Sequence, residues 1–214
     1  MKSDIFINLS EKDAADIIGR LCHEDMKKSN ILASISAAQF ILESGYGKTE
    51  LARNANNMFG MKANLSNNTW SGSTWDGTSI YTKKTKEEYK EGEITIITAD
   101  FRVYNSVEDS IADHSAYLLG AVRGKLPRYQ GLSGEKDYKK AIQIIKDGGY
   151  ATDSKYVSKI CNIIERFNLT KYDIIDSKRI MYYVQAGAFN IRSNADNLVK
   201  RLKDAGFDAF IKVD

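Results

Sequence analysis

The sequence predicts an α+β fold, in which a mainly α body carries a β-hairpin lobe and is followed by a small C-terminal βαβ unit. Three observations lead to this prediction. Apolar residues recur at helical spacing in several segments of residues 1–168. Two segments around Lys90–Gly92 read as strands, and β-branched residues dominate the second, which favours a hairpin. After residue 178 the pattern changes to strand, helix and strand.

Composition supports a packed domain and argues against several functional classes. The 214 residues suffice for one medium domain and a small appendage. A hydrophobic share of 43% with a single proline is compatible with a mostly helical core, and no segment is of low complexity. The net charge of +3 is too small to indicate a nucleic-acid partner. We expect no membrane insertion, because no segment is long and apolar enough to span a bilayer.

The first two helices are predicted from caps and apolar stripes. Ser10 with Asp13 resembles a capping box, so a helix should begin there. Ser29 or Asn30 is predicted to cap the second helix. The second helix should be largely buried, because its apolar stripe is wide: Ile31, Ile35, Ala38, Phe40, Ile41 and Leu42.

Further elements follow in chain order. They are a helical turn at Thr49–Arg53, strands at Ser79–Tyr89 and Glu93–Tyr104, and helices at Val107–Leu119, Lys136–Lys146 and Ser154–Phe167. Ser106 and Asp153 are predicted to cap the first and last of these helices. Residues 169–178 are predicted as a linker. The C-terminal unit should consist of a strand at Ile180–Ala186, a helix at Asn194–Ala205 and a strand at Phe207–Val213.

Glu43 is the candidate catalytic residue. It lies at the end of the second predicted helix, directly before the helix-breaking segment Ser44–Gly47. Desolvation and the negative end of the helix dipole both disfavour an ionised carboxylate at such a position. A carboxyl group that stays protonated near neutral pH is what a general acid needs to cleave an ether-like bond. The alternative is a helix-end Glu paired with a Lys or Arg.

We expect neither a cofactor nor a metal. The sequence holds two histidines and two cysteines, and they follow no metal-ligand spacing. Cys22 and Cys161 lie on separate predicted helices and could pair, but we expect two reduced, buried thiols.

Several separated motifs resemble one family. AQFILESGYGKTELA is followed by NNMFGMK, by Glu88-Tyr89, by Phe101–Tyr104, and by Gly149–Asp153 with Tyr156. In this order the motifs resemble the glucosaminidases of glycoside hydrolase family 73, within the lysozyme-like superfamily. The resemblance covers roughly residues 10–168. It implies a lysozyme-like catalytic domain at 1–168 that cleaves the β-1,4 bond after N-acetylglucosamine in peptidoglycan, as an endo-β-N-acetylglucosaminidase.

The same resemblance assigns the site residues. It implies that Glu43 is the acid and that Glu88, near the hairpin tip, is the second carboxylate used by most glycoside hydrolases. Tyr150 would hydrogen-bond the acetamido group of the substrate or the developing positive centre, with a buried core tyrosine as the alternative. Whether water or the substrate's own acetamido group attacks stays open. The substrate-binding candidates are Asn57, Phe59, Gly60, Lys62 and Tyr156, with an architectural role as the alternative for each. Trp70 and Trp75 could also stack on sugar faces, but the turn-rich insertion that carries them, Asn64–Gly77, is not a hallmark of the family.

The C-terminal part resembles half of another domain. Tyr182–Phe189, a helix and Gly206–Ala209 resemble the first half of a SPOR domain, a family that binds glycan strands stripped of their peptides. We therefore expect a partial SPOR-like wall-binding domain at 179–214. A single βαβ unit leaves strand edges uncovered, so the tail could be truncated, paired in a dimer or docked on the first domain.

These features predict peptidoglycan glycan strands as the partner. The first residues lack the apolar run of a signal peptide, so we expect a phage endolysin held in the host cytoplasm until its release to the cell wall, or a fragment of a larger exported protein. Two rival functions remain. A lytic transglycosylase would leave an anhydro-sugar product, and a wall-binding module would lack catalysis.

Overall fold

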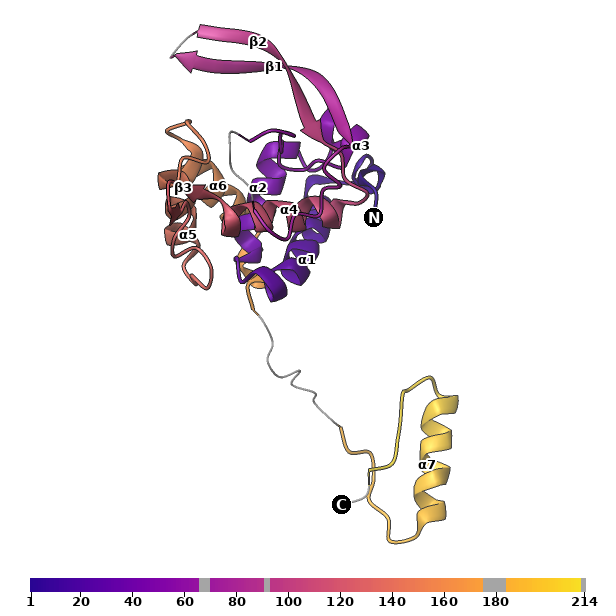
Figure 1. The fold of residues 1–214 in the computed structure, drawn as a ribbon. Helices are drawn as coiled ribbons and strands as arrows, with labels where there is room; N and C mark the ends of the chain where they lie inside the picture. The colour runs from indigo at the N-terminus through magenta and orange to yellow at the C-terminus, as the bar shows by residue number, and fades with distance from the viewer. Residues whose placement is uncertain (66–69, 91–92, 175–183, 213–214) are drawn as a thin grey trace. The chain divides into compact units, whose positions relative to one another are not determined.

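The computed structural model describes residues 1–65, 70–90, 93–174 and 184–212, and divides the chain into two compact units. The first unit is Met1–Ile175 and the second is Asp176–Asp214. In the first unit a helical body carries a long two-stranded hairpin (Figure 1). This confirms the predicted α+β class for the larger part of the chain.

The helix α2 (Ala33–Ser44) forms the centre of the body, packed against α1 (Glu11–Ser29), α6 (Tyr156–Arg166) and the short 3-10 helix η2 (Leu169–Tyr172). Ten of its 12 residues are buried. Its alanines and serines keep the helix narrow, which lets its neighbours approach closely from several sides. The predicted burial of this helix is confirmed.

The caps of the first two helices differ in one respect from the prediction. Ser10 caps α1 as predicted, since its Oγ accepts a hydrogen bond from the Asp13 N–H. The predicted cap of α2 is wrong. Asn30 adopts a left-handed conformation (φ 56°) and ends α1, whereas α2 begins after Leu32 and its Ser34 N–H donates to the distant Asp173 carboxylate (2.8 Å). Asn tolerates this conformation, so it serves as a helix stop here instead of a start.

The hairpin is confirmed, with strands β1 (Ile80–Lys90) and β2 (Glu93–Arg102) in antiparallel register. Its base is fixed to the body. Phe101 packs against the helix α3 (Glu50–Ala55), which extends two residues beyond the predicted turn, and pairs with Lys62 in an isolated bridge. The ladder is irregular between Glu88 and Lys90, close to the turn. Side chains of residues 85–96 lie outside the described part of the structure.

The second half of the first unit follows the predicted helices with shifted ends. Ser106 caps α4 (Val107–Gly120) as predicted, and α5 spans Tyr138–Asp147. The short strands β3 (Val122–Arg123) and β4 (Leu126–Pro127) were not predicted. The predicted cap of α6 is wrong, because α6 begins only at Tyr156, after Lys155. The Asp153 carboxylate instead accepts a hydrogen bond from the Lys155 N–H in the preceding turn.

Residues 169–172, which the sequence placed in a linker, form η2 and pack on α1, α2 and α6. Leu169 is fully buried, which explains why the chain stays on the body here. In the second unit, α7 (Arg192–Asp204) matches the predicted helix within two residues. Within 184–212 no strand forms, so the predicted strands are not found in those residues, and 180–183 lie outside the described part.

No helix among the described residues combines the length and apolar character needed to cross a membrane. Both cysteines are free thiols, with Cys22 buried and Cys161 partly exposed.

Candidate active site

Glu43 lies in the last turn of α2, and the chain leaves the helix immediately after it. Ser44 fixes this exit, because its hydroxyl donates to the Phe40 carbonyl (2.6 Å) and accepts from the Gly47 N–H (2.8 Å). Gly45 then takes a left-handed conformation (φ 54°), which glycine adopts without strain. The side chain of Glu43 therefore stands at the surface end of a helix whose remaining length is core.

The surroundings of Glu43 disfavour its ionised form. Desolvation by the protein around the carboxyl raises the pKa of Glu43, although the nearby Tyr156 hydroxyl and Lys159 ammonium partly offset this effect. The residue is nevertheless open to solvent on its outer side, as a proton donor to a large substrate must be. Desolvation, one of the two causes predicted from the sequence, is thus the main physical cause of the raised pKa of Glu43.

A second side chain on α2 supports Glu43 through Tyr156. Gln39 lies one turn before Glu43, and its Nε2 donates a hydrogen bond of 2.9 Å to the Tyr156 hydroxyl oxygen. With its oxygen so engaged, the Tyr156 hydroxyl can donate its own hydrogen toward Glu43. Sequence analysis did not select Gln39. Its spacing of four residues from Glu43, on the same helix face, was the available signal.

Tyr150 belongs to a loop whose backbone is held by cationic side chains. The Lys146 ammonium donates to three successive carbonyls, those of Ala151 (2.8 Å), Thr152 (3.0 Å) and Asp153 (2.7 Å). Arg128 donates to the carbonyls of Gly148 (2.7 Å) and Gly149 (2.9 Å) on the other side of Tyr150. The loop is thus fixed on both sides of the tyrosine.

The side chain of Tyr150 lies between α4 and α6. Its hydroxyl is 2.9 Å from Nε2 of His114, and its ring centroid is 5.9 Å from that of Tyr156. Burial raises the pKa of Tyr150 well above its usual value, and the charge of Glu43 contributes in the same direction. The structure therefore brings Glu43, Tyr150 and Tyr156 into one electrostatic cluster.

Glu88 is placed only by its backbone. It is paired with Ile94 across the hairpin, two residues before the end of β1. Its side chain belongs to the part of the hairpin that is not described. Its role as second carboxylate stays a prediction.

Residues of NNMFGMK mainly shape the backbone. Asn57 is buried, and its amide donates to the carbonyls of Met61 and Arg102 and accepts from the Met61 N–H, so no donor is left for a sugar. Phe59 stacks on His114. Gly60 has a φ of 67°, which explains the glycine by conformation, and a Cβ there would meet open space. For these residues the structure favours the architectural alternative.

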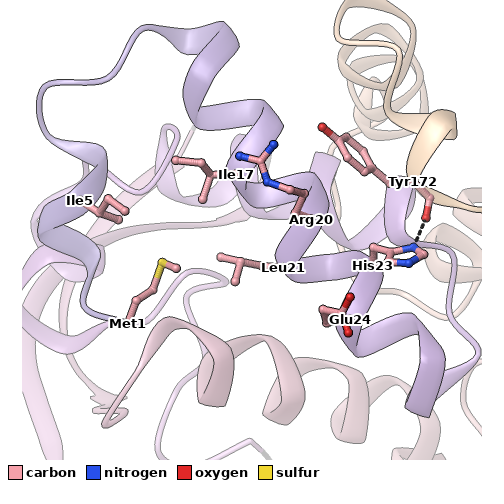
Figure 2. A pocket seen from close by; sticks show the side chains of 8 residues that line it. All are labelled: Met1, Ile5, Ile17, Arg20, Leu21, His23, Glu24 and Tyr172. Atoms are coloured by element: carbon pink, nitrogen blue, oxygen red, sulfur yellow. Dashed lines mark hydrogen bonds between the residues drawn. The ribbon is translucent and has the colours of Figure 1, made fainter. Parts of the chain in front are cut away.

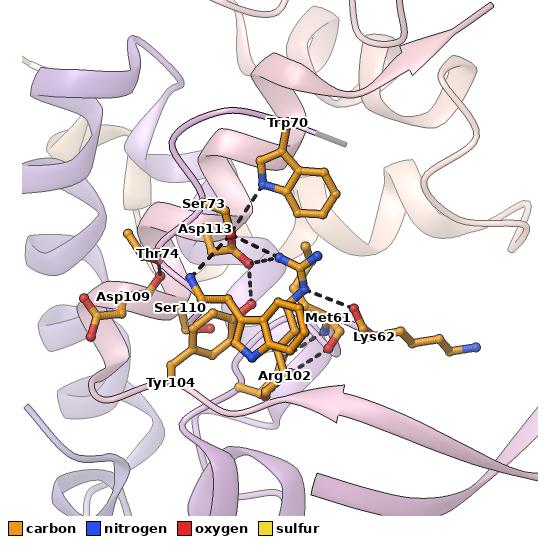
Figure 3. A network of polar contacts seen from close by, with 12 residues as sticks. Met61, Lys62, Trp70, Ser73, Thr74, Arg102, Tyr104, Asp109, Ser110 and Asp113 are labelled. Carbon is orange, nitrogen blue, oxygen red and sulfur yellow. Dashed lines mark hydrogen bonds and ion pairs between the residues drawn. The ribbon is translucent and has the colours of Figure 1, made fainter. Parts of the chain in front are cut away.

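The two tryptophans of the insertion lie against a buried ion pair, which Figure 3 shows with Trp70 beside Arg102 and Asp113. The Arg102 guanidinium lies 4.4 Å from the Trp70 ring centroid and 4.7 Å from that of Trp75. It also binds the Asp113 carboxylate at 2.8 Å. Asp113 accepts further hydrogen bonds from Tyr104, Ser73 and the Trp70 indole. Lys62 supplies its backbone carbonyl to Arg102, and its side chain extends away from this cluster (Figure 3). Both tryptophans therefore brace the insertion against β2 and α4.

A surface hollow of about 610 Å³ lies apart from these residues, between the N-terminal segment, α1 and η2 (Figure 2). It is lined mainly by apolar side chains with Arg20, His23 and Glu24, and none of the predicted site residues contributes to it. Among the described residues, no cluster of three His, Cys, Asp or Glu side chains could hold a metal ion.

Comparison with known families matches both parts of the chain. Residues 19–169 match the Glucosaminidase family, described as mannosyl-glycoprotein endo-beta-N-acetylglucosaminidase, and residues 179–214 match the SPOR domain. These matches confirm both resemblances predicted from the sequence.

Individual proteins show similarity to the first unit. The exo-glucosaminidase LytG of Bacillus subtilis is 33% identical over 150 residues, which cover 70% of this chain and 49% of that protein. The peptidoglycan hydrolase FlgJ of Escherichia coli K12 is 31% identical over 65% of this chain and 41% of its own length. The chain thus spans half or less of these curated relatives. The catalytic domain of the autolysin Auto from Listeria monocytogenes has a similar structure, with a TM-score of 0.62 and 29% identity over 79% of this chain and 94% of that domain.

Proposed function

Because the chain belongs to the glucosaminidase family, we propose that it hydrolyses the glycan strands of bacterial peptidoglycan at the β-1,4 bond after N-acetylglucosamine. One observation carries this proposal for the chain itself. Glu43 stands at the solvent end of a buried helix, in surroundings that raise its pKa, beside two tyrosines. This arrangement fits an acid that protonates a leaving glycosidic oxygen.

In the proposed reaction, Glu43 donates its proton to the bridging oxygen as the bond to the anomeric carbon breaks. Tyr156, held by Gln39, would orient the carboxyl group. We propose Glu88 as the second carboxylate, which activates water or stabilises the oxocarbenium-like transition state. Its place on a hairpin whose base packs against the body fits a wall of the active site that closes on the glycan strand.

The test is a digest of purified peptidoglycan, analysed by mass spectrometry. We expect fragments with N-acetylglucosamine at the reducing end. Anhydro-muramic ends would assign the chain to the lytic transglycosylases, and absence of cleavage would leave a wall-binding module as the function. The length distribution of the fragments separates endo cleavage from the release of terminal sugars, which the name of the LytG relative describes.

We propose that residues 179–214 bind glycan strands, in keeping with their match to the SPOR domain. The helix α7 carries no fully buried side chain, and large apolar residues such as Phe207 and Phe210 are exposed around it. Such side chains are suited to contact sugar rings or a second copy of the tail.

Deletion of Arg179–Asp214 should weaken binding to insoluble peptidoglycan while cleavage of soluble glycan strands continues at the wild-type rate. Co-sedimentation with cell walls measures the first effect and reducing-end release measures the second. Equal sedimentation of the truncated and full-length proteins would contradict the proposed role of the tail. Dimerisation through the tail predicts a mass of two chains in solution that falls to one upon the deletion. Storage in a host cytoplasm before release stays a prediction.

A further inference from the structure

His114 is a buried histidine that the proposed reaction does not yet use. It lies on α4, fully buried, with Nε2 directed at the Tyr150 hydroxyl at 2.9 Å. Its ring stacks on Phe59, with centroids 3.8 Å apart and planes 6° from parallel. Burial lowers the pKa of His114 to about 3, so the imidazole is neutral at ordinary pH and carries one proton on one of its two nitrogens.

The surroundings of the ring favour one position for this proton. Nδ1 is buried and has no hydrogen-bond partner among the described residues. A proton on Nδ1 would leave a buried N–H donor unpaired, a situation rarer in proteins than an unpaired acceptor. A proton on Nε2 is used, because it can be donated to the Tyr150 oxygen. The neutral form protonated on Nε2 therefore fits this site better.

We propose that His114 is a positioning residue that donates a hydrogen bond from Nε2 to Tyr150, and thereby directs the Tyr150 hydroxyl hydrogen toward the substrate. With one side of its oxygen engaged as an acceptor, Tyr150 acts as a donor. Its target is an acceptor oxygen on the sugar, and the acetamido carbonyl of N-acetylglucosamine is the group of that chemistry on the proposed substrate. This inference rests on the proposed function, because that function supplies the substrate.

The backbone on both sides of Tyr150 is held by other side chains. Lys146 and Arg128 hold the Tyr150 backbone through its neighbouring carbonyls. Against this fixed loop, the histidine, stacked on Phe59, would select the direction of the Tyr150 hydroxyl hydrogen.

Two substitutions in the full-length protein separate positioning from packing. His114→Phe keeps an aromatic ring on Phe59 and removes both the donor and the unpaired Nδ1. His114→Gln keeps a donor near the Nε2 position but loses the stack. On soluble glycan strands, we expect His114→Phe to lower kcat about tenfold with little change in KM, at a melting temperature no lower than that of the wild type. His114→Gln should be less stable than His114→Phe and yet more active.

The effect should also depend on Tyr150. In a Tyr150→Phe background, His114→Phe should cause no further loss of kcat, because the hydroxyl that it positions is gone. If activity follows stability across the variants, or if His114→Phe slows both backgrounds by the same factor, His114 is structural and the inference is wrong.

A spectroscopic measurement tests the proton position without catalysis. Two-bond ¹H–¹⁵N correlation spectra of the ¹⁵N-labelled full chain should show His114 protonated on Nε2 throughout pH 5–8. Protonation on Nδ1 would overturn the inference whether or not the protein cleaves glycan. Failure of the wild type to cleave peptidoglycan would instead contradict the proposed function, and the two failures are therefore distinguishable.

Discussion

Glu43→Gln should abolish hydrolysis of peptidoglycan, with a loss in kcat of about 10²–10⁴-fold on soluble glycan strands. The amide has nearly the shape of the carboxyl group but has no proton to transfer to the leaving oxygen. Reducing-end release, followed with time for purified wild type and variant, measures the loss. A variant that retains more than a tenth of the wild-type rate would remove Glu43 from the role of acid.

The hairpin carboxylates provide the matched comparison. Glu88→Gln should also slow the reaction strongly if it is the second carboxylate, whereas Glu87→Gln and Glu91→Gln, which change nearby carboxylates in the sequence, should not. If all three have equal small effects, the second carboxylate is not on the hairpin. The substrate's acetamido group would then be the better candidate for attack on the anomeric carbon.

The raised pKa of Glu43 also predicts how the rate and the stability depend on pH. The rate should fall as pH rises through the folded-state pKa, because the acid loses its proton there. Since the folded state binds this proton more tightly than the unfolded chain, Glu43 stabilises the fold most below its unfolded pKa of about 4.3 and loses that contribution as pH rises through the folded value. Glu43→Gln should therefore be at least as stable as the wild type at pH 7, with a smaller difference at pH 4.

Asp113→Asn should reduce the free energy of unfolding by about 3–5 kcal/mol, the usual cost of removing one partner of a buried ion pair. Asp113 is fully buried and Arg102 nearly so, and the variant would leave the guanidinium facing an amide without a counter-charge. Urea-induced unfolding, followed by tryptophan fluorescence, measures the change. The probe is well placed, because both tryptophans lie against Arg102.

A matched substitution and a double variant identify the cause. Asp147→Asn changes an exposed carboxylate that accepts a hydrogen bond from the Gln143 side chain, and should alter stability by less than about 0.5 kcal/mol. Arg102→Met combined with Asp113→Asn should cost less than the sum of the two single changes, because no unpaired charge remains. Additive losses would show that the ion pair is not what stabilises this region.

The elements predicted well from the sequence are those with a strong local signal. The capping pair Ser10 and Asp13, the apolar stripe of α2 and the β-branched strand β2 each specify their structure through neighbours in sequence. The start of α2 was mispredicted because Asn suits either end of a helix, and only the packing of Ile31 and Leu32 decides which. The sequence of η2 likewise resembles that of a linker. Its helical structure depends on the burial of Leu169 among helices, two of which, α1 and α2, are distant in sequence.

The candidate site was predicted only in part for the same reason. Glu43 carries a signal within its own helix, so it could be selected from the sequence. His114 could not be assigned a role, because its contacts, Phe59 and Tyr150, lie 55 residues before it and 36 after it in sequence. Arg102 and Asp113 give no sign in the sequence that they meet in the core.

The way the Tyr150 loop is held affects how this protein can change. Lys146 and Arg128 bind the loop through backbone carbonyls, which every residue possesses, so the hold does not depend on the side chains at Ala151 and Thr152. Substitutions at the exposed Thr152 can therefore accumulate without displacing the tyrosine, whereas Ala151 packs against the core. During evolution, substitutions beside Tyr150 could provide new contacts to chemically different glycan strands of the proposed substrate, while the proposed catalytic side chains keep their positions.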